Sequence, residues 1–365
     1  MPANLSPLLH LPDWLPDAVR LYLDHTAEGK SLRALARRAE LPVVKVMLAL
    51  IPAIAAYVWV YGAGILVTLA LASTTALAAE ALMLKLRNRP IKPFLMDGSA
   101  LLTAWLLALS LPPLAPWWLV VVGTLFAIVI AKHLYGGLGY NPFNPAMVGY
   151  AVLLISFPVI MTHWPAPLEL AQAKLSFADQ YQFIFGASLP NGVQLDAISM
   201  ATPLDYLKTQ LTLHHQVQDI TTALQFGAFG AKGGELVVWA YLLGGLYLLQ
   251  QRLITWHLPT AFLGALALMA GAFYLADATH FASPVFHLFT GASMLGAFFI
   301  ITDPVSGPTT PKGKLIFAIG IAVLTYLIRV YGGYPDGVAF SVLLMNMCVP
   351  LIDAWTQPRV FGHSK

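Results

Sequence analysis

A long succession of apolar segments limits what this chain can fold into more than any other feature. Ten segments come close to the length of about 20 apolar residues that a helix needs to cross a lipid bilayer, although 97–111 is short. They cover roughly residues 43–61, 64–84, 97–111, 117–133, 143–160, 235–250, 258–276, 285–302, 314–330 and 336–353. Only 10% of the 365 residues are charged, whereas a soluble domain has about 25%. The sequence therefore predicts an all-α integral membrane protein.

The distribution of basic residues predicts the orientation of the spans. If the N-terminus is cytoplasmic and the spans alternate, nearly all of the 20 Lys and Arg residues lie on the cytoplasmic side, as the positive-inside rule requires. The exceptions are Lys174, Lys208, Lys232 and Arg329. Both termini are therefore expected inside, as an N-terminal arm (1–42) and a C-terminal tail (354–365), and the loop 161–234 is expected outside.

The loop 161–234 is too long to be a simple connector, since structureless loops of this length are uncommon inside compact domains. It contains enough aromatic residues to pack into an ordered cap on the membrane body. These residues are Phe177, Tyr181, Phe183, Phe185 and Tyr206.

Two stretches on either side of this loop resemble each other. The matching blocks are Y-G-G at 135–137 and 331–333, and F-L-M-D-G-S-A-L-L-T-A-W at 94–105 with H-L-F-T-G-A-S-M-L-G-A-F at 287–298. Residues 43–160 contain five segments and residues 235–353 contain another five. Because five is an odd number, the second group must enter the membrane from the side opposite to the first. We therefore expect two inverted repeats, as in many transporters.

The glycines of D-G-S (97–99) and T-G-A (290–292) have two interpretations. They either expose helix N-termini to a polar ligand or allow close packing of helices.

Several polar residues fall at membrane depth. They are Ser73, Thr74, Thr75, Glu80, Asn144, Arg329 and Asn346. An ionisable group in a span raises the hypothesis of an ion path. The structural interpretation is stronger, because Glu80 stands about a turn from Lys85 at the cytoplasmic edge and Arg329 can extend outward to water.

A single cysteine excludes several kinds of site. Cys348 alone cannot form an intrachain disulfide, a four-cysteine iron–sulfur cluster or a structural zinc site. Because it stands in an apolar run, it is interpreted as a small buried hydrophobic residue. The histidines show no spacing typical of metal ligands, and no nucleic-acid partner is expected.

The segment D-A-I-S-M-A-T (196–202), followed by Pro203, stands out in the polar loop. Thr202 has two interpretations. It is a helix N-cap with Pro203 in the first helical position, which is the simpler one. Alternatively, its hydroxyl is esterified with the phosphate of FMN, which would keep a redox group outside the membrane from diffusing away.

From about residue 45 to the end, the sequence resembles the D subunit of the Rnf (Rsx) ion-translocating electron-transport complex. It is similar, more distantly, to the B subunit of the sodium-pumping NADH:quinone reductase. The blocks that carry the resemblance are D-G-S-A-L-L-T (97–103), L-P-P-L-A-P-W-W (111–118), A-K-H-L-Y-G-G-L-G-Y-N-P-F-N-P-A-M-V-G-Y (131–150), G-A-F-F-I-I-T-D-P-V-S (296–306) and Y-G-G-Y-P-D-G-V-A-F-S-V-L-L-M-N (331–346). Residues 1–42 do not match the family's shorter N-terminus.

The resemblance implies a multi-pass subunit of the bacterial inner membrane, with the loop 161–234 in the periplasm and FMN linked to Thr202 by a phosphodiester. Asp196, Ser199, Ala201 and Thr202 match the family's D-x-x-[ST]-x-A-T site, with Met200 where the family often has Gly. A dedicated flavin transferase would recognise Asp196 and Ser199. A second, non-covalent riboflavin is expected in the membrane body, at ligands that the sequence does not identify.

The expected activity belongs to a complex rather than to this chain alone. The resemblance implies electron transfer between reduced ferredoxin and NAD, coupled to movement of Na⁺ or H⁺, with other flavin-bearing, iron–sulfur and membrane subunits as partners. One alternative is a quinone-reductase B subunit. An alternative of another class is a channel or carrier with the same inverted-repeat body and no redox group.

Overall fold

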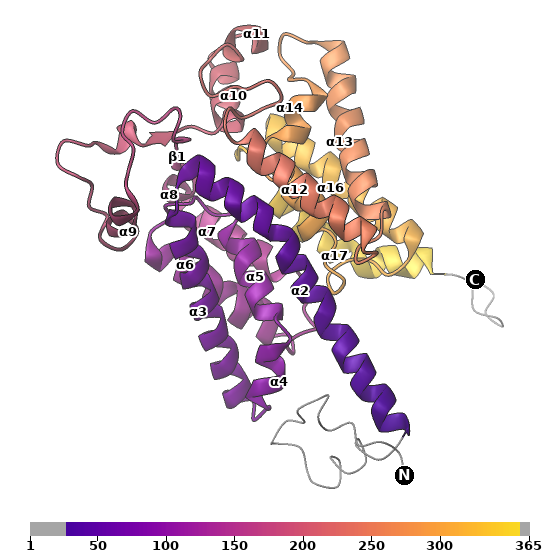
Figure 1. Ribbon diagram of the computed structural model, residues 1–365. Helices are drawn as coiled ribbons and strands as arrows, with labels where there is room; N and C mark the ends of the chain where they lie inside the picture. Colours follow the sequence, from indigo (N-terminus) through magenta and orange to yellow (C-terminus); the bar gives the residue numbers. More distant parts are fainter. Residues whose placement is uncertain (1–26, 358–365) are drawn as a thin grey trace.

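The computed structural model describes residues 27–357, with side chains from Pro42 onward, and these residues are mostly helical. Residues 1–26 of the expected arm and 358–365 of the expected tail lie outside the described residues. In chain order the elements are α2 (Ala27–Tyr61), α3 (Gly64–Leu86), α4 (Ile91–Met96), α5 (Ser99–Ala108), α6 (Trp117–Leu125), η2 (Phe126–His133), α7 (Pro145–Ser156), α8 (Pro158–Thr162), β1 (Trp164–Pro165), α9 (Phe177–Gly186), η3 (Leu195–Ala197), β2 (Ser199–Met200), α10 (Pro203–Thr212), α11 (Val217–Ile220), α12 (Glu235–Gln250), α13 (His257–Ala276), α14 (Pro284–Phe289), α15 (Ser293–Leu295), η4 (Gly296–Ile300), α16 (Pro311–Tyr331) and α17 (Val338–Thr356) (Figure 1).

The prediction of a helical membrane protein is confirmed. Five helical stretches are long and apolar enough to cross a bilayer: Pro42–Tyr61, Gly64–Leu86, His257–Ala276, Pro311–Tyr331 and Val338–Thr356. Four shorter apolar helices are Ser99–Ala108, Trp117–His133, Pro145–Ser156 and Glu235–Gln250. The remaining apolar segment, 285–302, is divided among α14, α15 and η4. All ten apolar segments are thus at least partly helical, and the count of ten spans stays a prediction.

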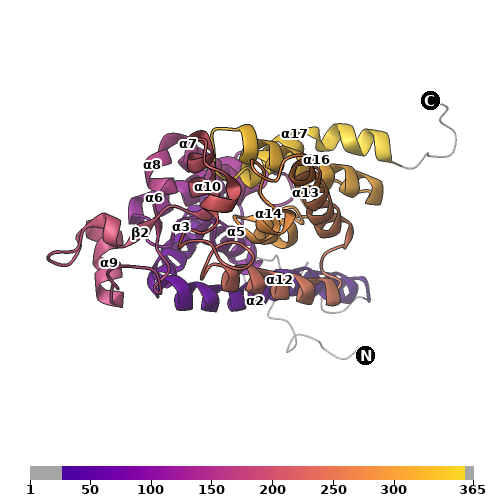
Figure 2. The same cartoon turned by 90° about the horizontal axis from the view of Figure 1, so that it is seen from above.

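Helices from both ends of the sequence share one packed body. A first helical half (α2 to α8) and a second helical half (α12 to α17) lie side by side (Figures 1 and 2). α2 packs along α12, and α7 packs against α17. α2 also runs without a break through Pro42, so the expected boundary between arm and first span falls inside one helix of 35 residues.

The close approach of α2 and α12 depends on a residue without a side chain. A Cβ atom added to Gly244 on α12 would meet the carbonyl oxygen of Ala49 on α2 well inside contact distance. We expect Gly244→Ala to lower the free energy of unfolding by about 1–3 kcal/mol, since backbone cannot yield as a flexible side chain can. The matched control is Gly264→Ala on α13, which has nothing within 4 Å of the added Cβ and should be neutral or stabilising. Thermal unfolding of the purified subunit would measure both, and equal midpoints would contradict the expectation.

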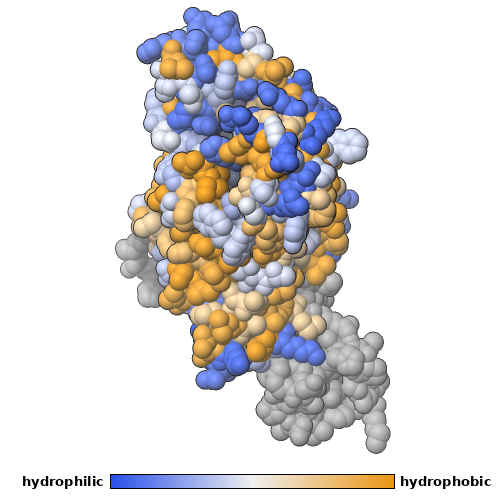
Figure 3. Space-filling view, turned by 90° about the vertical axis from the view of Figure 1, so that its left-hand side faces the viewer, coloured by the Kyte–Doolittle hydropathy of each residue, from blue (hydrophilic) through white to orange (hydrophobic). Residues whose placement is uncertain are grey.

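The outer surface of the helical body is largely apolar. Figure 3 shows one side of the molecule, where hydrophobic residues cover the middle and hydrophilic residues gather at the upper end, the end at which α10 and α11 lie in Figure 1. Cys348 also lies on this outer surface, on the same helix as the exposed Leu344 and Met347. The expectation of a buried Cys348 is therefore wrong, because in a membrane protein an apolar helix turns hydrophobic residues outward to lipid as well as inward.

The long loop is ordered, as the sequence predicts, but not all of its aromatic residues pack inside. α10 and α11 form a small core with α14 and the residue Ala282 before it. This core is made of Leu204, Leu207, Val217, Ile220, Ala282 and Phe286, and Tyr206 packs against it. Phe177, Tyr181 and Phe185 on α9 instead remain exposed. The loop is thus ordered by a small core around α10 rather than by its full set of aromatic residues.

Candidate functional site

Thr202 begins helix α10. Its hydroxyl oxygen accepts a hydrogen bond from the backbone N–H of Asp205 at 3.3 Å, and Pro203 occupies the first turn. The helix-cap interpretation of Thr202 is therefore confirmed. A cap still leaves open whether the hydroxyl carries a further group, which depends on the space around it.

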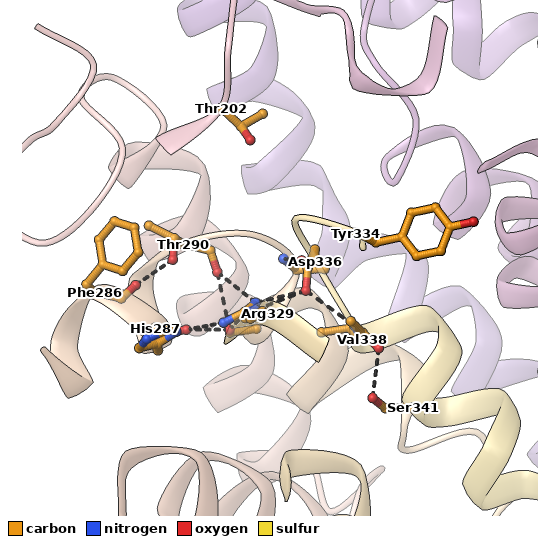
Figure 4. A network of polar contacts seen from close by, with 12 residues as sticks. Thr202, Phe286, His287, Thr290, Arg329, Tyr334, Asp336, Val338 and Ser341 are labelled. Atoms are coloured by element: carbon orange, nitrogen blue, oxygen red, sulfur yellow. Dashed lines mark hydrogen bonds and ion pairs between the residues drawn. The ribbon is translucent and has the colours of Figure 1, made fainter. Parts of the chain in front are cut away.

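A cavity of about 180 Å³ lies beside Thr202, between the two helical halves. Its walls are rich in aromatic side chains: Tyr57, Tyr61, Tyr150, Trp164, Tyr241 and Phe289. Its lining also includes Thr202 to Asp205 from the start of α10, and Thr290, Gly291, Ala292 and Asp336. Figure 4 shows Thr202 above Thr290 and Asp336. The predicted site residue thus opens onto a largely apolar space with a few polar groups, the usual make-up of a cofactor pocket.

The other residues of the predicted motif lie away from this cavity. Asp196 is exposed in the short helix η3, and Ser199 lies in β2, where its hydroxyl donates to the carbonyl of Leu195 at 2.9 Å. β2 pairs with β1, with Ser199 opposite Pro165. Ala201 is exposed and, with Thr202, lines a smaller cavity of about 40 Å³. Of the four predicted residues, only Thr202 lines the larger cavity.

A split helix forms the part of the cavity wall that faces Thr202. The chain breaks between α14 and α15 at Gly291, whose φ of 61° is in the left-handed region that favours glycine. Arg329 donates to the carbonyl oxygens of His287 (2.7 Å) and Thr290 (3.3 Å) at the end of α14 (Figure 4). Asp336 accepts from the backbone N–H of Ala292 at 2.7 Å. The two side chains therefore satisfy the backbone groups that the break leaves free.

Arg329 and Asp336 also bind each other. Nη2 of Arg329 lies 3.1 Å from Oδ1 of Asp336, and it donates to the hydroxyl of Ser293 at 3.0 Å. The Arg329 side chain is 1% exposed. The expectation that Arg329 extends outward to water is therefore wrong, because the broken helix offers it acceptors inside the protein.

The first helical half has a similar break between α4 and α5. Gly98 has a φ of 74°, and Asp97 accepts from the backbone N–H of Ser99 at 2.7 Å. At both breaks a carboxylate of this chain therefore takes an N–H group that follows the glycine. Of the two interpretations of these glycines, an exposed N-terminus waiting for a ligand is the less well supported.

Glu80 forms a buried ion pair near this break. Its carboxylate lies 2.8 Å from Nζ of Lys132, and both side chains are 2% exposed. Lys132 also donates to the hydroxyl of Ser99 at 2.8 Å, and Nε2 of His133 lies 3.1 Å from Glu80. The partner of Glu80 is thus Lys132 rather than Lys85. The sequence does not reveal this pair, since its members are 52 positions apart.

Asn144 and Asn346 join the two helical halves. The backbone N–H of Asn144 donates to Oδ1 of Asn346 at 3.1 Å, and its side-chain amide donates to the carbonyl of Ile300 at 3.2 Å. The amide of Asn346 donates to the carbonyl of Ser306 at 2.9 Å. These polar residues at membrane depth therefore have structural partners, which accounts for their position without an ion path. Among the described residues, no group of three or more His, Cys, Asp or Glu side chains could hold a metal ion.

Lys208 holds α10 on the second helical half, a role that the sequence does not indicate. Its Nζ donates to the carbonyl oxygens of Ile328 (3.2 Å), Arg329 (3.3 Å) and Tyr334 (2.9 Å) at the end of α16. Burial lowers the pKa of Lys208, opposed by the nearby charge of Asp205, and burial raises the pKa of Asp205, opposed by Lys208. Leu204 adds contact with the break at Gly291. The position of Thr202 is therefore set by contacts with α16 and the split helix.

We expect Lys208→Met to loosen α10 while the membrane body stays folded. The variant loses hydrogen bonds from a charged donor, each worth about 1.5–3 kcal/mol in favourable cases, less where water competes at this half-exposed site. Hydrogen–deuterium exchange of the α10 amides should rise, while that of α13 should not change. Lys174→Met, at an exposed position in the same loop, is the control. Unchanged exchange in α10 would show that Lys208 does not hold it.

The fold and this site define a helical, multi-pass membrane protein with two split helices and a polar segment placed over a cavity between its halves. The model of the NQR2, RnfD, RnfE family matches residues 35–362, and the chain belongs to this family. Three curated relatives, each named as the D subunit of an ion-translocating oxidoreductase complex, are 54% identical to it. That of Aeromonas hydrophila aligns over 326 residues (87% of this chain and 93% of that protein), that of Escherichia fergusonii over 328 (88% and 93%), and that of Yersinia pseudotuberculosis serotype O:1b over 325 (87% and 93%).

Proposed function

We propose that this chain is the D-type membrane subunit of an ion-translocating oxidoreductase complex and relays electrons through FMN bound covalently to Thr202. The observation that carries the assignment is 54% identity over nearly the whole length of proteins with that name. The complex exchanges electrons between reduced ferredoxin and NAD and couples this exchange to movement of Na⁺ or H⁺. Its other subunits supply the iron–sulfur clusters, and this chain has no activity alone.

The residues around Thr202 fit a flavin. Thr202 lines a cavity whose aromatic walls, including Tyr61, Trp164 and Phe289, suit a flat, apolar ring system. A phosphodiester on Thr202 would stand at the N-terminus of α10, a helix of 10 residues, where the helix dipole stabilises a negative charge. Cap and anchor are therefore compatible roles for one residue. The flavin supplies the electron-transfer chemistry, and the protein supplies the tether and the surroundings that tune its potential.

The exposed part of the motif suits recognition by a maturation enzyme. Asp196 is open to solvent, and Ser199 stands on the same short stretch before Thr202. We assign to Asp196 and Ser199 the contact with a flavin transferase, and to Ala201 the small side chain that leaves Thr202 accessible. The non-covalent riboflavin expected from the family is proposed for the membrane body without assigned ligands.

The proposed topology has ten spans in two inverted repeats, 43–160 and 235–353, in the bacterial inner membrane. Both termini are cytoplasmic, and 161–234 is the periplasmic insert that carries the flavin. Support comes from the two glycine breaks, Gly98 and Gly291, which occupy matching places in the two repeats and each have a buried cation nearby. The complex as a whole is an ion-translocating oxidoreductase.

Two alternatives predict different observations. A B-type subunit of a sodium-translocating NADH:quinone reductase belongs to the same family, and quinone reduction by the purified complex would support it. Ferredoxin–NAD exchange would count against it, as the names of the relatives do. A channel or carrier without a redox group would show no bound flavin.

Intact mass of the purified subunit tests the proposal directly. We expect the mass of the chain plus one FMN less one water when the flavin transferase is co-expressed, and the mass of the bare chain when it is absent. The bare mass in both preparations would contradict covalent flavin binding.

A further inference from the structure

Helix α9 carries an aromatic stripe that the described part of the protein leaves uncovered. Phe177, Tyr181 and Phe185 follow one another at intervals of four residues and therefore share one side of the helix. Their exposed fractions are 55%, 49% and 39%. The rings of Tyr181 and Phe185 contact each other, with centroids 4.7 Å apart and planes tilted by 39°. Three large aromatic side chains in a row at a helix surface indicate a site of interaction.

A neighbouring face of α9 is held at the ends of two spans. Gln180 is buried, and its Oε1 accepts from the backbone N–H of Gly64 at 2.6 Å while Nε2 donates to the carbonyl of Tyr61 at 3.4 Å. Tyr61 is the last residue of one candidate span, and Gly64 is the first residue of the next. α9 is therefore held at the depth at which two apolar spans end, where the bilayer passes from hydrocarbon to headgroups.

α9 also lies across the direction of the neighbouring spans. Figure 1 shows it nearly end-on beside the upper end of α3, and Figure 2 shows it lengthwise, beyond the edge of the helical bundle. Tyr181 and Phe185 each follow a buried residue, Gln180 and Ile184, so these two rings point about 100° away from the attached side, while Phe177 lies at its edge. The aromatic rings are therefore directed sideways at the level of the span ends rather than back onto the protein.

We propose that α9 is an interfacial helix that inserts Phe177, Tyr181 and Phe185 into the bilayer surface on the side of the segment 161–234. Aromatic rings prefer this depth, since they pack against acyl chains while a tyrosine hydroxyl reaches the headgroup region. Exposed tryptophans mark the same boundary on neighbouring spans, with Trp59 near the end of α2 and Trp117 at the start of α6. α9 precedes the strand that leads to Thr202, so it fixes the height of that segment above the membrane. The inference does not require flavin at Thr202.

Depth-dependent quenching in the complete complex tests this proposal. Cys348→Ser first removes the exposed native thiol. Tyr181→Cys is then labelled with bimane, and the complex is placed in phosphatidylcholine vesicles that carry a doxyl group at a shallow or a deep acyl position. The signal of the Cys348→Ser complex treated with bimane in the same way is subtracted, because other subunits also contain cysteines. We expect a loss of fluorescence that is larger for the shallow group than for the deep one. The control is Gln218→Cys, at an exposed position on α11 at the upper end of the molecule in Figure 1. A bimane label at this position should be quenched only by aqueous iodide.

Two results would overturn the proposal. If the label at position 181 behaves like the label at position 218, the stripe lies in water. If neither lipid nor iodide quenches it, another protein of the complex covers the stripe. As a further measurement, Phe177→Ser with Phe185→Ser should reduce the shallow-lipid quenching at position 181, and quenching that stays the same would show that these rings do not hold α9 at the membrane. The fluorescent flavin band, if present in the parent protein, should persist and report that the segment remains folded.

Discussion

Replacing Thr202 with Asn should abolish covalent flavin attachment and leave the fold unchanged. Asn is as good an N-cap as Ser, Asp or Thr, so the bond from the backbone N–H of Asp205 keeps an acceptor. Asn has no hydroxyl, however, and cannot form the phosphodiester. A denaturing gel under ultraviolet light should show a fluorescent band for the parent chain and none for Thr202→Asn. The complex that carries this variant should lose ferredoxin–NAD electron transfer while it still assembles.

Three further variants separate the cap from the anchor. Thr202→Ser retains both the cap and a hydroxyl and should keep a fluorescent band. Thr202→Ala loses both, so a dark band should come with a loss of stability of about 0.5–2 kcal/mol. Thr209→Ala, at an exposed position on the same helix, is the matched control and should remain fluorescent. A fluorescent band in Thr202→Asn would place the flavin on another residue.

Arg329→Met should destabilise the protein strongly. The substitution leaves Asp336 partly buried without its cation, and it removes the donor that satisfies the carbonyl oxygens of His287 and Thr290. Breaking a buried pair in this way costs about 3–5 kcal/mol. The thermal unfolding midpoint of the purified complex should fall accordingly. Arg89→Met, at an exposed position, should change stability by less than about 0.5 kcal/mol.

A double variant separates the lost charge pair from lost packing. Asp336→Asn in the Arg329→Met background removes the uncompensated carboxylate, while the amide oxygen still accepts from the backbone N–H of Ala292. The double variant should therefore be more stable than Arg329→Met alone, with a coupling free energy that a double-mutant cycle measures. If the double variant is no more stable than the single one, the ion pair is not the source of the effect.

Features with a local cause were predictable from the sequence. The helix start at Thr202 followed from a hydroxyl side chain before Pro203. The sequence also singled out Gly98 and Gly291, where the structure has its two breaks, but left open whether they expose helix N-termini or allow close packing. Apolar length alone identified the helical segments. Family membership followed from long blocks of sequence, and the comparisons confirm it.

The errors have two physical origins. Glu80 pairs with Lys132 from another helix, and Arg329 turns inward to a broken helix about 40 positions earlier in the chain. A buried charge seeks whichever partner the fold brings close, and sequence distance does not report that partner. Cys348 is exposed because an apolar position on a membrane helix faces lipid as readily as it faces the core.

The sequence by itself determined the class of this protein. A chain with so few charges and so many long apolar segments can satisfy its backbone in lipid only as helices, and the local chemistry of threonine, proline and glycine determines where helices begin and break. Only the tertiary structure decided what those features are used for. It places Thr202 over a cavity between the two halves, brings Lys208 onto the end of α16, and turns the aromatic stripe of α9 away from the protein. Each of these depends on which surfaces of distant segments meet, and that is set by packing of the whole chain rather than by any one stretch of it.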